Sequence, residues 1–471
     1  MKTKSAIYRY VPKTAYKELN KWLATEPPEF KFETDTFVFI LDLFYRLNEY
    51  NLDVREKKGG FTEISSRYFR ASIPNGYASY VGYLIRKEIV LTDGSFDKEK
   101  HICLGYKINP TMESKLIQVA INPESPIAHK IRENANRKRK LESKQAPFIR
   151  KLKENLKLIQ FDEKKAVKFL NKQLFEGELS LNKYNRHMFK LTKILNKQFY
   201  CKRNRTNFRL DTTFTNLLKE LRYFIVGGYI TIDLCNSQPY LLVYILRKYL
   251  EYVDKRNNQI AVQVNNDNNC IDKVLPSSCG EDFGQKGIDR LLDKAFRKFK
   301  NVPILDLEEV RKFNEITRTN QFYNLFMDEF GIIRDDAKKL TLATLYSPNR
   351  FSNYEAEKQV FRRQFPTIYA FIYEFKRKDY KKLSITMQIL ESTIFIDCVA
   401  KYLVEQGIEL DTIHDSLIVK EQDEPQAMFA LEYTFMKFFG ELPSFKTEKL
   451  CSDDIDIEIY HVFVEKYKAV A

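Results

Sequence analysis

The stretch of residues 229–243 constrains the fold of this chain more strongly than any other. Its first four residues, Tyr-Ile-Thr-Ile, predict a short buried strand because they are aromatic or β-branched, and Asp233 follows directly. After a short polar turn, Pro239 opens an apolar run that predicts a helix, since proline is favoured at a first helical position. The pattern therefore predicts a strand that places one carboxylate at the edge of a sheet, just before a helix.

A second stretch, residues 411–419, presents another carboxylate in a similar way. Two apolar, strand-like segments are separated by the tight turn His414-Asp415-Ser416. Two acidic groups on adjacent strand ends can bind a pair of divalent cations over one catalytic centre. We therefore predict that Asp233 and Asp415 are catalytic metal ligands. Two Mg²⁺ ions are the expected cofactor, because paired carboxylates and substrate phosphates are hard oxygen ligands.

Four residues spaced four apart predict one face of a helix that can bind a nucleotide. They are Arg334, Lys338, Leu342 and Tyr346. Two cations and an aromatic ring on one helix face can bind a triphosphate and close over a base pair. Gln388, at the head of a later apolar helix that leads to the Asp415 strand, adds a polar side chain on the way to the same centre.

The order of these motifs resembles the polymerase core of family A DNA polymerases and of the related single-subunit phage and mitochondrial RNA polymerases. The resemblance covers roughly residues 195–470. Asp233 and Asp415 resemble the two catalytic aspartates of that family. The helix with four-residue spacing resembles the fingers helix that binds the incoming nucleotide.

The resemblance also implies roles for the other candidate residues. Gln388 resembles the glutamine that contacts the minor groove of the template–primer duplex, and Arg209 resembles the arginine of an element that precedes the first aspartate. His414 stands where the family implies a contact with the primer terminus. The resemblance therefore implies that these three residues bind nucleic acid, and that Gln238 binds nucleotide.

The choice between DNA and RNA as product depends on one position after the first aspartate. In the family a bulky residue there excludes a ribose 2′-hydroxyl, whereas the RNA enzymes have glycine. This sequence has two extra residues between Asp233 and Ser237 relative to the DNA polymerase pattern, so the position holds either Gln238 or Tyr240. Neither is small, and we therefore expect DNA synthesis. A single-subunit RNA polymerase or a primase-like enzyme is the alternative.

Charge and local patterning predict contacts with nucleic acid outside this core. The net charge is +15, which favours a polyanionic partner. Residues 126–160 are the most basic part of the chain, and we predict phosphate contacts from its run Arg137, Lys138, Arg139 and Lys140. The alternative is an ordinary solvated helix face in a lysine-rich protein.

The N-terminal region predicts a small domain with a recognisable order of elements. Expected helices at 61–70 and 77–86 are followed by expected strands at 89–91 and 103–108, which resembles a winged-helix DNA-binding module. A non-catalytic DNA-binding replication protein that uses only this module and the basic helices is therefore an alternative of another class. Because the module occupies the N-terminal part, we expect no proofreading exonuclease.

The predicted fold class is α+β: a right-hand polymerase with an antiparallel palm sheet and helical fingers and thumb, preceded by the winged-helix-like domain. The expected domains are 1–120, winged-helix-like; 121–200, basic helical and thumb-like; 201–250, first part of the palm; 251–380, fingers with a polar insertion; and 381–471, second part of the palm. Expected partners are DNA template and primer, or RNA, and nucleoside triphosphates.

Two further expectations concern the cellular location of the protein and the binding of metals other than magnesium. The chain starts without a signal-peptide core, and no uninterrupted apolar run reaches the roughly 18 residues of a membrane span. We therefore expect a cytoplasmic protein without membrane contact. The seven cysteines form no C-x-x-C pair and the five histidines are dispersed, which argues against a zinc site.

Overall fold

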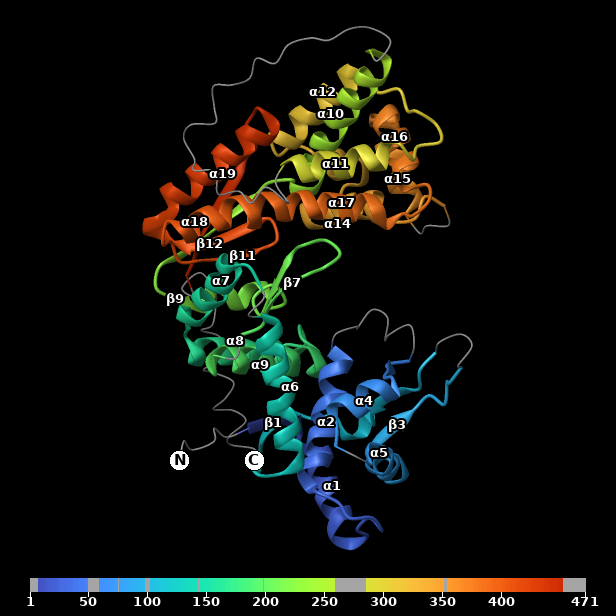
Figure 1. Ribbon diagram of the computed structural model, residues 1–471, viewed down its shortest axis with the longest axis vertical. Coiled ribbons are helices and arrows are strands. Elements are labelled where there is room, and N and C mark those ends of the chain that lie inside the picture. Colours follow the sequence, from blue (N-terminus) through green and yellow to red (C-terminus); the bar gives the residue numbers. More distant parts are fainter. Residues whose placement is uncertain are drawn as a thin grey trace. The chain divides into compact units, whose positions relative to one another are not determined.

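The protein combines helices with several small antiparallel sheets (Figure 1). The computed structural model describes residues 7–49, 59–74, 76–97, 102–142, 145–197, 199–258, 285–350 and 354–451. The chain divides into two compact units, each made of two separate stretches of sequence. Unit 1 consists of Met1–Gln145 and Val167–Thr192, and unit 2 of Ala146–Ala166 and Lys193–Ala471.

Two sheets occur in the described part of unit 1. One pairs β1 (Ile7–Pro12) with β5 (Leu116–Ile121), and the other has the strand order β2-β4-β3. The three strands of the second sheet are β2 (Thr62–Glu63), β4 (Gly105–Ile108) and β3 (Val90–Thr92). The helices are α1 (Lys13–Thr25), α2 (Thr34–Glu49), α4 (Ser66–Ser72), α5 (Tyr77–Arg86), η1 (Pro110–Met112) and α6 (Pro126–Glu142), with α8 (Glu163–Phe175) and α9 (Leu181–Leu195) divided between the units.

An aromatic core joins the helices of unit 1 to its three-stranded sheet. Phe44 of α2 stacks on Tyr106 of β4 with ring centroids 5.3 Å apart, and Phe69 of α4 meets the same tyrosine edge-on at 5.5 Å. Phe37 of α2 packs against Tyr80 of α5 at 4.7 Å. All five rings are buried. They therefore stabilise the unit both by apolar burial and by ring–ring contact.

The helix predicted at 77–86 is confirmed as α5, whereas the helix predicted at 61–70 is wrong at its start. The first residues of that segment form β2, which pairs with β4. Helix α4 begins only after Ser65, whose hydroxyl accepts a hydrogen bond from the Tyr68 N–H at 3.2 Å. A capping serine inside the predicted helix thus marks its true start.

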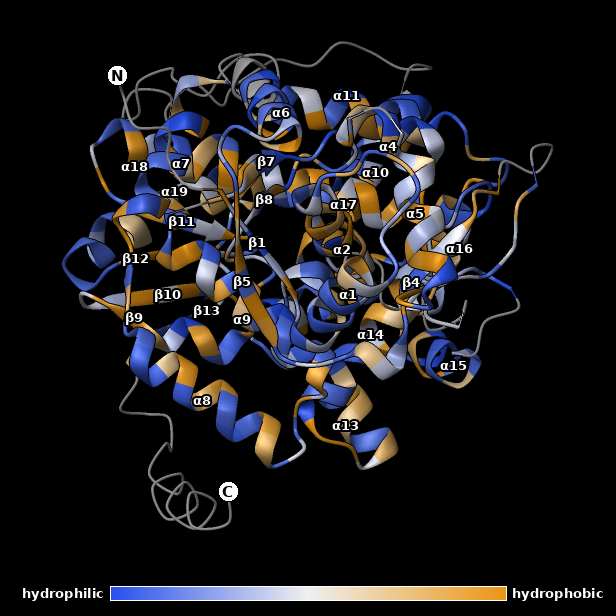
Figure 2. Cartoon of the chain, turned by 90° about the horizontal axis from the view of Figure 1, so that it is seen from below, coloured by the Kyte–Doolittle hydropathy of each residue, from blue (hydrophilic) through white to orange (hydrophobic). Residues whose placement is uncertain are grey.

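Unit 2 is built on a four-stranded antiparallel sheet with the order β11-β12-β10-β13 (Figure 2). The strands are β10 (Tyr229–Leu234), β11 (Leu410–Ile413), β12 (Ser416–Lys420) and β13 (Phe445–Leu450). The first three confirm the strands predicted around the two aspartates. The fourth forms an edge that the sequence pattern did not predict.

The two faces of this sheet differ in polarity because side chains alternate along a strand. Ile230, Ile232 and Leu234 of β10 lie on one face and are buried, and Figure 2 shows β10 and β12 as strongly hydrophobic strands. Thr231 and Asp233 lie on the other face, where the threonine hydroxyl donates a hydrogen bond to the carboxylate at 3.2 Å. The alternation therefore presents Asp233 on the polar face at the end of the strand.

The rest of unit 2 consists mainly of helices. Within the described residues they are α7 (Pro147–Leu158), η2 (Lys219–Phe224), α10 (Ser237–Asn258), α11 (Gln285–Phe296), α12 (Leu307–Arg318), α13 (Asn324–Phe330), α14 (Arg334–Tyr346), α15 (Glu355–Gln364), α16 (Pro366–Lys376), α17 (Lys381–Ser392), η3 (Thr393–Ala400), α18 (Lys401–Glu405), η4 (Glu421–Asp423) and α19 (Glu424–Phe439). Two short strand pairs complete the unit: β6 (Gln160–Phe161) with β9 (Ile225–Val226), and β7 (Cys201–Arg203) with β8 (Leu210–Thr212).

One described helix, the continuous run Lys381–Glu405, has the length and hydropathy of a membrane span. However, 83% of its most apolar window is buried inside the protein. Its residues Met387, Leu390 and Phe395 are among those with no exposed surface. The apolar side chains are therefore covered by protein, as in a core helix.

Two buried lysines hold the C-terminal end of α14. The Lys376 ammonium donates to the backbone carbonyl of Thr344 at 3.1 Å, and the Lys358 ammonium donates to that of Pro348 at 2.5 Å. The Lys376 contact satisfies a backbone carbonyl that the end of the helix leaves without an intrahelical partner, and the Lys358 contact holds the chain two residues beyond the helix. Burial, and secondarily the Lys358 charge, lower the pKa of Lys376 to about 7.

The lowered pKa of Lys376 predicts a stability that increases with pH. Above pH 7 the folded state binds fewer protons at this lysine than the unfolded state does, so raising the pH favours folding. We expect the free energy of unfolding to rise by up to about 1.4 kcal/mol per pH unit between pH 7 and 9. Urea unfolding at pH 7, 8 and 9 measures this slope. The slope of the unfolding free energy against pH should be smaller in Lys376→Met. An unchanged slope would show that Lys376 does not cause this pH dependence.

Candidate active site

The strand register brings Asp233 and Asp415 together. Asp233 is paired with Ser416, the residue after Asp415, and the Leu234 N–H donates to the Asp415 carbonyl oxygen at 3.1 Å. Both carboxylates are half-buried. Asp233 therefore lies in β10 and Asp415 in the turn just before β12, and paired strands in a sheet are about 4.8 Å apart.

Tight turns produce this convergence. Asn236, between β10 and α10, has φ of 50°, and His414, between β11 and β12, has φ of 57°. Such left-handed backbone conformations are uncommon for residues other than glycine, although asparagine and histidine are enriched among them. Each turn lies next to the end of a strand and changes the chain direction beside an aspartate. Asp233 and Asp415 therefore both stay at the edge of the sheet.

The charges of the two aspartates act on the same neighbouring group. Burial raises the pKa of the Cys235 thiol, Asp233 and Asp415 add to this shift, and Arg334 and Lys446 oppose it. The charge of Arg334, in the first turn of α14, thus acts on the same thiol as the two aspartates. The arrangement joins two carboxylates with a cation from a helix that is distant in the sequence.

Asp233 and Asp415 can supply some, but not all, of the ligands of a divalent cation. No group of three or more His, Cys, Asp or Glu side chains suited to a metal occurs in the part of the chain that the structure describes. Two carboxylates on adjacent strands nevertheless supply the protein ligands that Mg²⁺ commonly uses, since its remaining ligands are often substrate phosphates and water. Asp233 and Asp415 would therefore hold such ions only together with substrate.

A buried polar network lies beside the pair and is centred on Glu391. The Arg209 guanidinium binds this carboxylate with two hydrogen bonds, of 2.7 and 2.8 Å. The Gln238 amide also donates to Glu391, and the Tyr346 hydroxyl donates to the Gln238 carbonyl oxygen at 2.5 Å. Four segments far apart in the sequence therefore share one hydrogen-bonded chain.

Burial governs the titration of this network. It raises the pKa of Glu391 to about 7; Arg209 opposes the shift and Asp415 adds to it. Burial likewise raises the pKa of the Tyr346 hydroxyl, which stays protonated and available as a donor. Breaking the Arg209–Glu391 pair would leave one charge buried without compensation, which is costly.

Two of the residues expected to bind nucleic acid border this network. The carbonyl oxygen of Gln388 accepts a hydrogen bond from the Asn207 amide at 2.8 Å. Burial lowers the pKa of His414 to about 4, and the nearby Arg209 and Arg222 add to this shift. The imidazole is therefore neutral at pH 7, with one nitrogen able to accept a hydrogen bond.

The predicted nucleotide-binding face is present on α14. Arg334 and Lys338 are exposed, Leu342 is half-buried, and Tyr346 reaches Gln238. The guanidinium of Arg334 donates to Asn320 and lies over the ring of Tyr323, 5.0 Å from its centroid. Lys338 has no ion-pair partner among the described residues, so its charge is available to a ligand.

The predicted phosphate contacts of the basic run belong to unit 1. Helix α6 contains all four residues of the run. Arg137 is exposed and pairs with Glu133 at 2.5 Å. The side chains of Lys138, Arg139 and Lys140 lie outside the described part of the structure. The role of this run stays a prediction.

The sequence pattern assigned no role to Glu391, Tyr323 or Arg222. Burial raises the pKa of the Tyr323 hydroxyl, the Asp415 charge and Cys235 add to this shift, and Arg334 opposes it. Burial lowers the pKa of Arg222, whereas Asp233 and Asp411 oppose that shift. A lone glutamate within an apolar helix was the available signal for Glu391, because it requires a buried partner.

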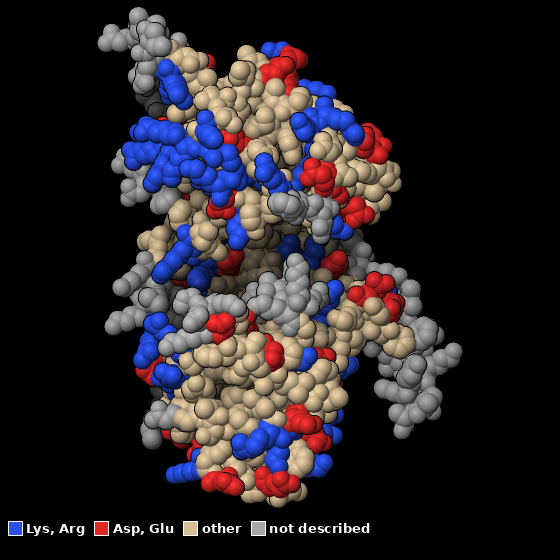
Figure 3. Space-filling model, turned by 90° about the vertical axis from the view of Figure 1, so that its right-hand side faces the viewer, with Lys and Arg blue, Asp and Glu red and all other residues tan. Residues whose placement is uncertain are grey.

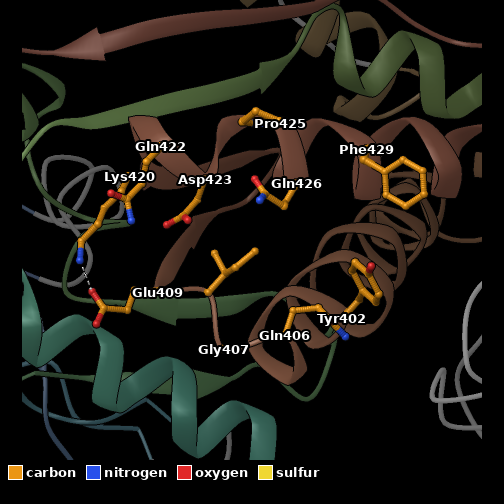
Figure 4. Close-up of a pocket in the computed structure, with 11 residues that line it drawn as sticks. Tyr402, Gln406, Gly407, Glu409, Lys420, Gln422, Asp423, Pro425, Gln426 and Phe429 are labelled. Atoms are coloured by element: carbon orange, nitrogen blue, oxygen red, sulfur yellow. Dashed lines mark ion pairs between the residues drawn. The ribbon is translucent and has the colours of Figure 1, made fainter.

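A groove of about 750 Å³ lies at the opposite end of the sheet (Figure 4). The ion pair of Lys420 with Glu409, at 2.8 Å, borders one side, and Tyr402 and Phe429 border another. β12 begins beside Asp233 and ends at Lys420, so the length of the strand separates this groove from the carboxylate pair. The groove is therefore distinct from the candidate active site.

No protein-family model matches the chain, and no curated protein matches its sequence. Among solved structures, the POL domain of Pol1 from M. smegmatis, in complex with DNA primer-template and dNTP, is similar with a TM-score of 0.26 and 11% sequence identity. The match covers 59% of this chain and 54% of that chain, so this chain spans about half the length of that structure. A likeness this low leaves the function to be argued from the geometry of the site.

Proposed function

We propose that this protein is a template-directed nucleotidyltransferase, a DNA polymerase of the family A type without proofreading. One observation carries the proposal: Asp233 and Asp415 lie at adjacent strand ends, and Arg334 at the start of α14 acts on the same thiol, that of Cys235, as the two aspartates do. The expected partners are a DNA template with primer and nucleoside triphosphates. Bound Mg²⁺ would neutralise charge on the transferring and leaving phosphates.

The residues of the chain divide the remaining tasks. Asp233 and Asp415 present oxygen ligands, and the exposed cations Arg334 and Lys338 bind the triphosphate, where preorganised charge stabilises the transition state. Tyr346 packs beside the new base pair. Its hydroxyl is bound by Gln238, which Glu391 holds in turn, so the ring keeps one orientation.

Two further contacts position the nucleic acid. Gln388 reaches the minor groove, where every base pair presents acceptors that such a side chain can sense. Neutral His414 offers a hydrogen bond to the primer terminus. In unit 1, the order α2, β2, α4, α5, β3, β4 with the sheet order β2-β4-β3 supports the proposal of a winged-helix-like DNA-binding module.

The contacts of the two side chains, both of which are buried, favour Gln238 over Tyr240 as the residue that excludes ribonucleotides. Tyr240 has no exposed surface, and its ring stacks on Phe439 with centroids 4.6 Å apart. Gln238 instead touches Tyr346 of the nucleotide-binding helix. DNA synthesis is therefore the proposed activity, and RNA synthesis is the alternative.

Primer extension with dNTPs and with NTPs tests the proposal. We expect extension with dNTPs by the wild type, and a rise in NTP use relative to dNTP use, on the order of 10-fold, in Gln238→Ala, because less bulk faces the 2′-hydroxyl. Tyr240→Phe is the matched control and should keep the wild-type ratio. Extension with ribonucleotides alone by the wild type would favour the RNA enzyme instead.

A further inference from the structure

Two basic segments of unit 2 lie side by side on a surface for which no role has been assigned so far. Lys298 and Lys300 follow α11, and Lys378, Lys381 and Lys382 surround the start of α17. All are exposed except Lys382, which is half-buried. We call these five lysines, together with the neighbouring Tyr380, the α17 patch. The upper part of Figure 3, where α10 to α17 lie, shows a dense group of Lys and Arg side chains.

Apolar and polar contacts fix the two segments against each other. Phe299 points inward and packs on Phe371 and Phe375 of α16, with ring centroids 5.8 Å apart in both cases. The N–H of Lys300 donates to the buried Glu374 carboxylate at 2.6 Å. The lysines on either side of Phe299 therefore face outward on a backbone that is already held in place.

The charge of the α17 patch is largely uncompensated. Glu374 is neutralised by Arg377, which binds it at 2.8 Å, and the Asp379 carboxylate accepts the Lys381 N–H at 3.0 Å. None of the five lysines has an ion-pair partner among the described residues. Burial, then the Lys298 and Lys378 charges, lower the pKa of Lys382, whereas Asp379 opposes the shift. An anion at this place would relieve the repulsion.

Tyr380 adds an aromatic surface to these cations. Its side chain is 38% exposed, and the Lys381 ammonium lies 5.7 Å from the ring centroid. Lysines beside an exposed ring are the combination that binds single-stranded nucleic acid, because phosphates meet the cations and an unpaired base can stack on the ring. A duplex offers the phosphates alone, since its bases are already stacked.

The α17 patch is connected to the candidate active site through two rigid elements. Helix α17 starts at Lys381 and carries Gln388 seven residues later, a rise of about 10 Å. Lys376, just before the α17 patch, is bonded to Thr344 near the Tyr346 end of α14. A nucleic-acid strand that runs from the candidate active site along α17 therefore reaches these lysines within two to three turns of the helix.

We propose that the α17 patch binds the single-stranded template ahead of the candidate active site. The identity of this strand as template rests on the proposed function, whereas binding of single-stranded nucleic acid rests on the charge and the ring alone. The full-length triple variant Lys298→Gln, Lys378→Gln, Lys381→Gln tests it. The triple variant Lys312→Gln, Arg362→Gln, Lys437→Gln, at exposed cations elsewhere in unit 2, is the matched control.

Fluorescence anisotropy with a labelled thymidine 12-mer and with a blunt 12-base-pair duplex, without Mg²⁺ or nucleotide, measures the effect. For the α17 patch variant we expect single-strand affinity to fall on the order of 10- to 100-fold, and the slope of log affinity against log salt to shrink by about 2. Duplex affinity should change by less than about threefold, as should both affinities of the control. Tyr380→Ala should weaken single-strand binding at least about fivefold.

Unchanged single-strand binding in the α17 patch variant would overturn the proposal, and so would an equal loss in the control variant or for the duplex. An unfolding temperature equal to that of the wild type shows that each variant is folded. Primer extension is assayed separately. If the wild type does not extend primers but the α17 patch variant has lost single-strand binding, the polymerase proposal fails, whereas the assignment of the α17 patch as a binding surface for single strands is supported. If extension occurs and single-strand binding is unchanged, only the α17 patch assignment fails.

Discussion

Asp415→Asn should lose nucleotidyl transfer by at least about 1,000-fold while it remains folded. Cation binding by the two aspartates would contribute several kcal/mol to the transition state, and each 1.36 kcal/mol corresponds to a tenfold change in rate. The side chain is half-buried at a strand end, so the isosteric amide fits the same place. Single-turnover primer extension measures the loss, and thermal unfolding confirms the fold.

The same logic predicts that the two aspartates act as a unit. Asp233→Asn should lose about as much activity as Asp415→Asn, and the double variant little more, because residues that act together are not additive. Asp423→Asn is the matched control, since this half-buried aspartate lies near the opposite end of the same sheet, beside the separate groove. Full activity in Asp415→Asn would refute the catalytic assignment.

Glu391→Gln should destabilise unit 2 by about 3 kcal/mol. Glu391 is buried and accepts two hydrogen bonds from Arg209, whose side chain is 18% exposed. Removing one partner of a buried pair leaves the other charge without compensation. The amide also loses one acceptor oxygen for Gln238, so Tyr346 is held less firmly and the KM for nucleotide should rise. Urea unfolding and steady-state extension measure the two effects.

A paired variant separates stability from function in this network. Arg209→Met combined with Glu391→Leu removes both charges and should recover much of the lost stability, since apolar replacements of a buried ion pair are often neutral. Activity should not recover, because Gln238 and Tyr346 then lack their anchor. If Glu391→Gln alone were as stable as the wild type, the network would not stabilise the site as described.

The sequence pattern predicted the part of the site that short-range rules govern. Strand β10 follows from an apolar run that leads to Asp233, and β12 from an apolar run that follows the Asp415 turn. The α14 face follows from a four-residue spacing. Strand β13 was not predicted because Lys446, Glu448 and Lys449 give an edge strand the composition of a loop. The sequence pattern also predicts a strand at residues 455–465, which lie outside the described part of the structure.

The Glu391 network could not be predicted because its partners are distant in the sequence. Arg209 is 182 positions from Glu391, and Gln238 is 153 positions away. No local pattern shows that these side chains meet. The choice between Gln238 and Tyr240 was open for a similar reason, since only their packing partners separate them: Phe439 of α19 for Tyr240 and Tyr346 of α14 for Gln238.

A crystal structure with primer-template, a non-hydrolysable nucleotide and Mn²⁺ in place of Mg²⁺ tests the convergence of the two aspartates most directly. Anomalous scattering should place two metal ions about 3.5–4 Å apart, both bound by Asp233 and Asp415, with Arg334 and Lys338 on the triphosphate. Metal ions absent from this pair, or a nucleotide seated in the groove beside Lys420, would contradict the proposed active site.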